Sequence, residues 1–170
     1  GDAGACHPRD NIALRWLAQE YDIGYDLFDT VMHAREIQAE NLAKFLIEQS
    51  RDAGDLPIAI HGKAYKPDVE YCIGSYSTLV GHYVTKHSGK PVIYIDPLAD
   101  DSTDVAQEMR EPAVYLWAHN RKITYEYTGH QDDTKPYCEI QPGSIIVDPW
   151  RKLESTDTVR VVHYGNTRVQ

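Results

Sequence analysis

Five short apolar runs after Pro57 constrain the fold of this chain more than any other feature. They lie in the segments Ile58–Ile60, Pro91–Pro97, Ala113–Trp117, Ser144–Asp148 and Val159–His163. Nearly continuous apolar runs of this length are typical of strands buried on both faces of a parallel sheet. Helical patterns lie between some of them, from about Ser75 to Lys86 and from about Asp104 to Arg110. The alternating segment Ile123–Tyr127 could add an edge strand. Strands that alternate with helices predict an α/β fold, a mostly parallel sheet flanked by helices and joined by right-handed crossovers.

The segment before Pro57 has a helical pattern instead. Apolar residues within Ile12–Leu17 follow a period of 3.6, and Asp10 could cap the helix that they predict. A second, long helix is expected from about Asp26 to Arg51. A helix of that length extends about 40 Å, which suits a connector between domains or a dimer interface. We therefore expect a helical unit over residues 1–54 and an α/β unit over residues 55–170.

Composition excludes several classes of protein. The chain has 17 basic and 26 acidic residues, a net charge of −9, so a nucleic-acid or anionic-membrane partner is not expected. One small phosphorylated ligand, held by a few local cations, remains compatible with that charge. No apolar run approaches the roughly 20 residues that span a bilayer. The 42% apolar content is enough for a core and argues against disorder.

Cysteine usage indicates a reducing compartment. The chain has three cysteines, Cys6, Cys72 and Cys138, with no C-x-x-C pair. An odd number without such spacing predicts neither a disulfide framework nor a structural zinc site, and we expect no metal. The expected location is therefore cytoplasmic.

Two loops are candidates for a ligand site, because open parallel sheets bind ligands at the carboxyl ends of their strands. They are Gly62–Asp68, after the first expected strand, and Asp96–Pro97, after the second. Lys63 and Lys66 in the first loop would suit a phosphate, and the alternative is a surface turn with solvated lysines. The loop is not G-x-G-x-x-G, so the dinucleotide-binding fingerprint is absent from it.

The first ten residues hold a second candidate site. Cys6 stands just before the first expected helix, with Arg9 close behind it, and both features lower the pKa of a thiol and make it a better nucleophile. Asp10 could orient a water or act as acid or base. Each residue also has a structural alternative: Asp10 an N-cap, Cys6 a small half-buried side chain, His7 a surface imidazole.

Several segments together resemble the UDP-glucose/GDP-mannose dehydrogenase family. Gly4–Leu14 is similar to the family's catalytic loop, G-G-x-C-F-P-K-D-x-x-A-L, and Ile58–Pro67 to its I-A-x-x-G-x-A-F-K-P. Val92–Pro97 resembles the V-x-x-Y-D-P strand, Ser144–Asp148 the closing I-x-D segment, and Val161–Arg168 the final Y-x-G-x-x-R. The matches keep the family's order and extend over nearly the whole chain.

The resemblance implies oxidation of the 6-hydroxymethyl group of a nucleotide sugar to a carboxylate, with two NAD per turnover, and a Rossmann-like nucleotide-sugar-binding domain over residues 55–170. Cys6 would capture the intermediate aldehyde as a thiohemiacetal and carry the thioester that follows, and Asp10 would assist hydrolysis. Arg9 would lie near the nicotinamide cofactor. The residues implied to contact a nucleotide sugar, a UDP-sugar by preference, are Gly1, Gly4, His7, Tyr65, Lys66 and Arg151.

The chain also departs from the family pattern. Ile73 stands where the family has an Arg that approaches the cofactor, and Arg151 is preceded by Pro149 and Trp150 rather than by D-G. The family's N-terminal dinucleotide domain has no counterpart here, so we expect a C-terminal part of a longer enzyme, inactive by itself, and a homodimer through the long helix. Two alternatives stay open: a non-catalytic nucleotide-sugar-binding or assembly module that diverged from this family, and an unrelated α/β binding domain.

Overall fold

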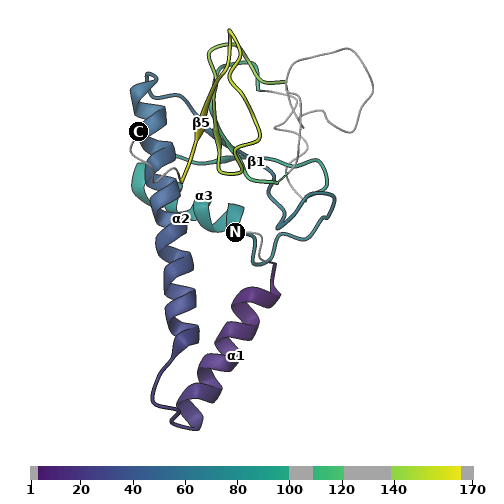
Figure 1. The fold of residues 1–170 in the computed structure, drawn as a ribbon. Helices are drawn as coiled ribbons and strands as arrows, with labels where there is room; N and C mark the ends of the chain where they lie inside the picture. Colours follow the sequence, from purple (N-terminus) through teal and green to yellow (C-terminus); the bar gives the residue numbers. More distant parts are fainter. Residues whose placement is uncertain (1–3, 100–108, 121–138, 166–170) are drawn as a thin grey trace.

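The computed structural model describes residues 4–99, 109–120 and 139–165 and has the α/β architecture that the apolar runs predict (Figure 1). The helices are α1 (Cys6–Glu20), α2 (Leu27–Asp52) and α3 (Tyr76–Ser88). The strands are β1 (Ile58–His61), β2 (Ile93–Ile95), β3 (Val114–Trp117), β4 (Ile145–Asp148) and β5 (Arg160–His163). In Figure 1, α1 and the first half of α2 form a hairpin that extends away from the sheet.

All five strands are parallel, in the spatial order β2-β1-β3-β4-β5. This is a doubly wound order whose switch point lies between β1 and β3. The strands predicted from the apolar runs are all confirmed. The expected helix near Asp104–Arg110 lies mostly outside the described residues, and the extra edge strand expected at Ile123–Tyr127 lies wholly outside them.

Two helices begin with the side-chain caps that their sequences provide. Asp26 accepts a hydrogen bond from the backbone N of Asp29 at 2.8 Å and caps α2. Ser75 accepts one from the backbone N of Ser77 at 3.2 Å and caps α3. Such caps satisfy backbone donors that the first turn of a helix leaves free.

Helix α1 begins earlier than expected and has no side-chain cap. Its hydrogen bonds already start with His7 N donating to Gly4 O at 3.1 Å, so Asp10 lies inside the helix and the prediction that it caps α1 is wrong. The proline at position 8 needs no partner in a first turn, where backbone N–H groups have no helical acceptor. Asp10 instead accepts a hydrogen bond from Arg9 at 2.8 Å.

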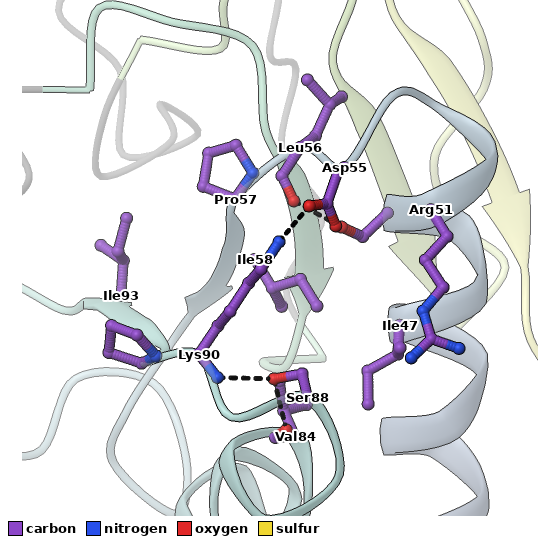
Figure 2. A pocket seen from close by; sticks show the side chains of 12 residues that line it. Ile47, Arg51, Asp55, Leu56, Pro57, Ile58, Val84, Ser88, Lys90 and Ile93 are labelled. Atoms are coloured by element: carbon purple, nitrogen blue, oxygen red, sulfur yellow. Dashed lines mark hydrogen bonds and ion pairs between the residues drawn. The ribbon is translucent and has the colours of Figure 1, made fainter.

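The carboxyl ends of α2 and α3 lie close together at the amino-terminal edge of the sheet. Ser50 O accepts hydrogen bonds from several backbone N–H groups of the turn that follows α2. Gly89, in the left-handed region with φ 71°, ends α3. An ion pair between Lys90 and Asp55 joins the two turns (Figure 2).

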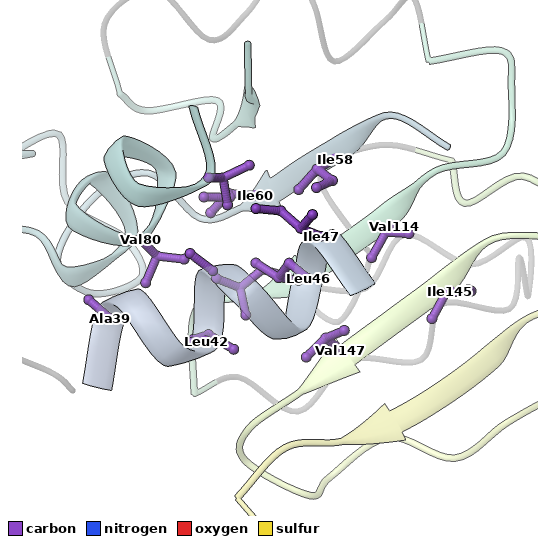
Figure 3. Packing of buried hydrophobic residues seen from close by; sticks show 13 residues of the cluster. Ala39, Leu42, Leu46, Ile47, Ile58, Ile60, Val80, Val114, Ile145 and Val147 are labelled. Carbon is purple, nitrogen blue, oxygen red and sulfur yellow. The ribbon is translucent and has the colours of Figure 1, made fainter. Parts of the chain in front are cut away.

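One face of the sheet is covered by α2 and α3, and the cluster between them forms the larger core (Figure 3). Its buried members include Ala39, Leu42, Leu46, Ile47, Ile58, Ile60, Val80, Val84, Val114, Leu116, Ile145 and Val147. The strand residues in this set alternate with those of a second cluster on the other face, which contains Ala59, Tyr115, Trp117 and Ile146. Both faces of the central strands are therefore buried, as their apolar composition requires. Within the described residues, no helix is apolar enough over a sufficient length to cross a membrane.

Candidate functional site

The loops that follow β1 and β2 meet at the carboxyl edge of the sheet. Asp96 is buried after β2, and its Oδ2 accepts hydrogen bonds from the backbone N of Lys63 and of Ala64, both at 2.9 Å. The two loops expected to form a site therefore lie side by side. Because Asp96 already occupies these two amides, a phosphate cannot also bind them.

The two lysines of the β1 loop lie near aromatic rings. Lys63 Nζ is 5.7 Å from the ring centroid of Tyr94, and Lys66 Nζ is 5.4 Å from that of Tyr65. Lys66 is exposed, whereas Lys63 is half-buried. Lys66 can therefore contact a negatively charged ligand directly, whereas Lys63 would first have to leave its half-buried position.

A buried histidine after β3 holds the same loop, and sequence reasoning missed it. His119 Nε2 lies 3.0 Å from Ala64 O, and a Cβ atom at Gly62 would lie 2.7 Å from the imidazole ring. Gly62 has φ 103°, so both its backbone conformation and this close approach require glycine. The signal that could have revealed His119 is its place directly after the apolar run of β3, at the switch point.

Asp148 organises the loop after β4. Its two carboxylate oxygens accept four backbone hydrogen bonds, from the N atoms of residues 150, 151, 152 and 153, at 2.7–3.1 Å. The loop turns Trp150 back over the sheet edge, where its Nε1 donates to Trp117 O at 3.1 Å. Arg151 is exposed and has no ion pair within the described part of the chain.

These loops and helix α2 surround a cavity of about 260 Å³. Its lining residues are Gln38, Asn41, Leu42, Tyr65, Tyr76, Ser77, Leu116, Ala118, Pro149, Trp150 and Tyr164. Four of them are aromatic and none is charged. Burial raises the pKa of Tyr76 to about 12, with Tyr164 adding to the rise and Arg35 opposing it. The cavity is therefore aromatic and uncharged at neutral pH.

The start of helix α1 is docked on the β1 loop. A Cβ atom at Gly4 would lie 3.0 Å from Cδ2 of Tyr65, and one at Gly74 would lie 2.8 Å from the Cα of Ala5. Arg35 of α2 supports the same turn by donating to Gly74 O at 3.0 Å. The structure thus brings Gly4 against Tyr65, and Tyr65 also lines the aromatic cavity.

Cys6, Arg9 and Asp10 lie on the exposed side of this first turn. Asp10 raises the pKa of Arg9 above its ordinary value by a hydrogen bond and by its charge, and Cys6 adds a smaller effect in the same direction. His7 is half-buried, and its Nδ1 is buried with no hydrogen-bond partner among the described residues. Gly1 lies outside the described residues. The catalytic, substrate and cofactor roles of these residues stay predictions.

Among the described residues, no group of three or more His, Cys, Asp or Glu side chains could hold a metal ion. The resemblance also implies a dinucleotide cofactor, but the backbone amides of Lys63 and Ala64 in the switch-point loop are not free to bind its phosphates. The amides of the switch-point loop are engaged by Asp96, and Ile73, at the family's Arg position, is an exposed apolar side chain. The described residues therefore form no complete binding site for NAD.

Comparison with known proteins finds likeness in structure alone. No family model matches the chain, and no curated protein matches its sequence. A GDP-mannose dehydrogenase from Pseudomonas aeruginosa matches with a TM-score of 0.56 at 13% identity, over 93% of this chain and 38% of that enzyme.

Two further structures match over less of the chain. A UDP-D-ManNAc dehydrogenase from Pyrococcus horikoshii has a TM-score of 0.48 at 18% identity, over 72% of this chain and 30% of that one. A UDP-N-acetyl-mannosamine dehydrogenase from Staphylococcus aureus has 0.44 at 15%, over 73% of this chain and 31% of that one. The chain is a parallel α/β domain preceded by a helical hairpin, and it shares this fold with the first of these enzymes. It spans about a third of the length of each.

Proposed function

We propose that this chain is the nucleotide-sugar-binding part of an NAD-dependent nucleotide-sugar 6-dehydrogenase. The observation that carries the proposal is the contact between Gly4 and Tyr65. It joins the segment similar to the family's cysteine loop to the segment similar to its A-F-K-P loop, although the two are far apart in the sequence. Chance matches to the two motifs would have no reason to pack against each other at the carboxyl edge of a sheet.

We expect the ligand to lie along this edge, between the first turn of α1 and the loops after β1 and β4. An uncharged cavity lined by Tyr65 and Trp150 suits a planar base or the face of a sugar ring. The exposed cations Lys66 and Arg151 belong to two of the loops that line the cavity, and they would neutralise a diphosphate. An uncharged cavity with two cations beside it explains how a chain of negative net charge could bind an anionic ligand. A UDP-sugar is the preferred candidate.

Within the complete enzyme, Cys6 would react with the aldehyde formed from the sugar. Its sulfur would bond to the aldehyde carbon while the carbonyl oxygen takes up a proton, giving a thiohemiacetal. After oxidation to the thioester, Asp10 would assist the attacking water. Since the described residues form no complete binding site for NAD, the hydride acceptor would be bound mainly by a part of the enzyme outside them, with Arg9 near its nicotinamide.

Isothermal titration calorimetry with UDP-glucose and GDP-mannose tests the binding proposal. We expect saturable heat with one of them, and an affinity about tenfold lower for Tyr65→Leu, because a stacked aromatic contact is worth about 1 kcal/mol or more. Tyr25→Leu, at an exposed tyrosine of the hairpin, is the matched control and should bind as the unchanged protein does. Absence of heat with both ligands, from protein that is folded by circular dichroism, would overturn the proposal.

A non-catalytic binding or assembly module is the second candidate. It is favoured by the exposed Ile73 and by the absence of a dinucleotide cradle among the described residues. Alkylation of Cys6 by iodoacetamide, in a Cys72→Ser, Cys138→Ser background, separates the two. A fast, pH-independent reaction near neutrality supports the catalytic role, and the slow reaction of an ordinary thiol supports the module.

The exposed surface of the helical hairpin suggests that the chain forms a homodimer. The helical hairpin exposes many large apolar side chains, and this is typical of interaction sites. They are Ile12, Leu14, Trp16, Leu17, Tyr21, Ile23, Tyr25 and Leu27. We propose that a second copy of the chain covers this surface.

A further inference from the structure

A second cavity, of about 460 Å³, lies at the opposite edge of the sheet from the candidate site (Figure 2). It is formed where α2 and α3 end and where β1 and β2 begin. The lining residues are Ile47, Ser50, Arg51, Asp55, Leu56, Pro57, Ile58, Val84, Ser88, Lys90, Pro91 and Ile93. Ile58 and Ile93 belong to segments that resemble the family's motifs, but the proposed function assigns no role to any of these lining residues.

The interior of this cavity is apolar, because its polar groups are already paired. Ser50 Oγ donates to Leu56 O at 2.5 Å. Ser88 Oγ donates to Val84 O at 2.7 Å and accepts from the backbone N of Lys90 at 3.0 Å. A ligand that enters therefore meets the side chains of Ile47 and Ile93 and finds no free hydroxyl. The part of a ligand that fits inside is aliphatic.

Of the two cationic side chains at the rim of this cavity, one has no partner among the described residues. Lys90 is paired with Asp55, whereas the guanidinium of Arg51 is exposed and has no hydrogen bond or ion pair among the described residues. Two helix C-termini face this edge, and their partial negative charge disfavours an anion held by backbone alone. An anionic head group would thus depend on the Arg51 side chain, whose planar fork matches a carboxylate.

We propose that this cavity binds an amphipathic monocarboxylate, with its aliphatic chain among Ile47, Val84 and Ile93 and its carboxylate on Arg51. The volume lies within the range of small-molecule sites and the cavity is concave, so a free small molecule suits it better than a protein segment. One available guanidinium matches one carboxylate better than a dianionic phosphate. A bound ligand would connect α2, α3 and the sheet, and would raise the stability of the folded state in proportion to its occupancy.

Octanoate is the probe that tests this site, with octanol and octylamine as matched compounds that lack the negative charge. Calorimetry should show one saturable site for octanoate and weaker binding of both other compounds. Arg51→Gln should weaken octanoate about tenfold, because it removes a charge-assisted hydrogen bond. Lys44→Gln, at an exposed lysine of the same helix, should leave octanoate binding unchanged. Both variants change exposed side chains and should fold.

Methyl resonances locate the bound chain. Octanoate should shift the signals of Ile47, Val84 and Ile93, and Arg51→Gln should leave the affinity for UDP-glucose unaltered, so this site and the proposed nucleotide-sugar site are tested separately. The proposal is overturned if octanoate does not saturate, if octanol binds as tightly, if Arg51→Gln binds octanoate normally, or if the shifts occur elsewhere in the molecule.

Discussion

The ring of Tyr65 lies against the backbone of Gly4, with 3.0 Å between Tyr65 Cδ2 and the position that a Cβ atom would take at residue 4. Tyr65 follows β1 at the carboxyl edge of the sheet, and Gly4 precedes the first turn of α1. Its neighbour Ala5 packs on Gly74 in the same way. These contacts hold the thiol-bearing turn beside the aromatic cavity, and the first prediction follows from them.

Gly4→Val should lower the affinity for a nucleotide sugar about tenfold or more. A branched side chain at this position must displace the Tyr65 ring, and overpacking of this kind costs about 1–3 kcal/mol. Calorimetry with UDP-glucose measures the effect. Ala13→Val, a substitution on the exposed surface of α1, should leave the affinity unchanged. Equal affinities for Gly4→Val and the original protein would show that the contact does not shape the site.

Gly81→Ala should destabilise the protein, although alanine favours a helix by about 1 kcal/mol over glycine. The added Cβ would collide with the hydroxyl of Tyr94 from β2, so either the Tyr94 side chain or α3 must shift. We expect a loss of about 1–3 kcal/mol in the free energy of unfolding, measured in urea. Tyr94→Phe removes the clashing oxygen, and the double variant should recover part of the loss. A Gly81→Ala variant more stable than the original would contradict this packing.

Asp148→Asn should cost about 3 kcal/mol in the free energy of unfolding, because a buried carboxylate that accepts four backbone hydrogen bonds loses one of its two accepting oxygens. The amide would turn its NH₂ group toward two backbone donors. Thermal and urea unfolding measure the loss, and Asp157→Asn, at an exposed carboxylate, is the control. The same change should loosen the loop that carries Trp150 and Arg151, so the affinity for a nucleotide sugar should fall with it.

Stability should decline between about pH 10 and pH 12, partly through Tyr76. Burial raises the pKa of this phenol from 10.0 to about 12, so the folded state retains a proton that the unfolded state releases. The contribution is complete below pH 10 and disappears as the pH rises through 12. Tyr76→Phe should flatten this part of the profile in urea unfolding at a series of pH values. Tyr71→Phe, at an exposed phenol outside the proposed dimer surface, should leave it unchanged.

Trp16→Asp should convert the proposed dimer into a monomer. Trp16 is 58% exposed in the single chain, and a carboxylate placed within an apolar interface would lose its hydration without gaining a partner. Sedimentation equilibrium measures the change. Leu98→Asp, a similar substitution at an exposed residue beside the sheet, should remain dimeric. If the original chain sediments as a monomer, the hairpin surface belongs to another partner.

The sheet and the long helix could be predicted because their signals are local. Strands such as β1 and β3 are buried on both faces, so their sequences are nearly continuous in apolar residues. Asp26 marks the start of α2 because its side chain caps the helix directly. The start of α1 was predicted wrongly for the opposite reason. No side chain caps it, and its first turn is positioned by Gly74 and Tyr65, which are distant in the sequence.

The candidate site could be predicted only in part, because most of it depends on tertiary contacts. Tyr65 and Lys66 belong to a loop that the strand pattern places at the carboxyl edge. The aromatic cavity combines residues from α2, α3, β3 and four loops, and no periodicity connects Tyr76 with Trp150 and Tyr164. His119 contacts the β1 loop at Gly62 and at Ala64 O, and only the folded arrangement reveals this role.

The central claim is that the first turn of α1, which carries Cys6, and the loop after β1 form one nucleotide-sugar site. The most direct test is to titrate the ¹⁵N-labelled chain with UDP-glucose and to follow its amide resonances. The account predicts that the amides of Gly4, Cys6, Tyr65 and Lys66 shift together and saturate at a common dissociation constant, while residues at the opposite edge of the sheet do not move. Shifts confined to one of the two segments, or none in a folded protein at saturating ligand, would contradict it.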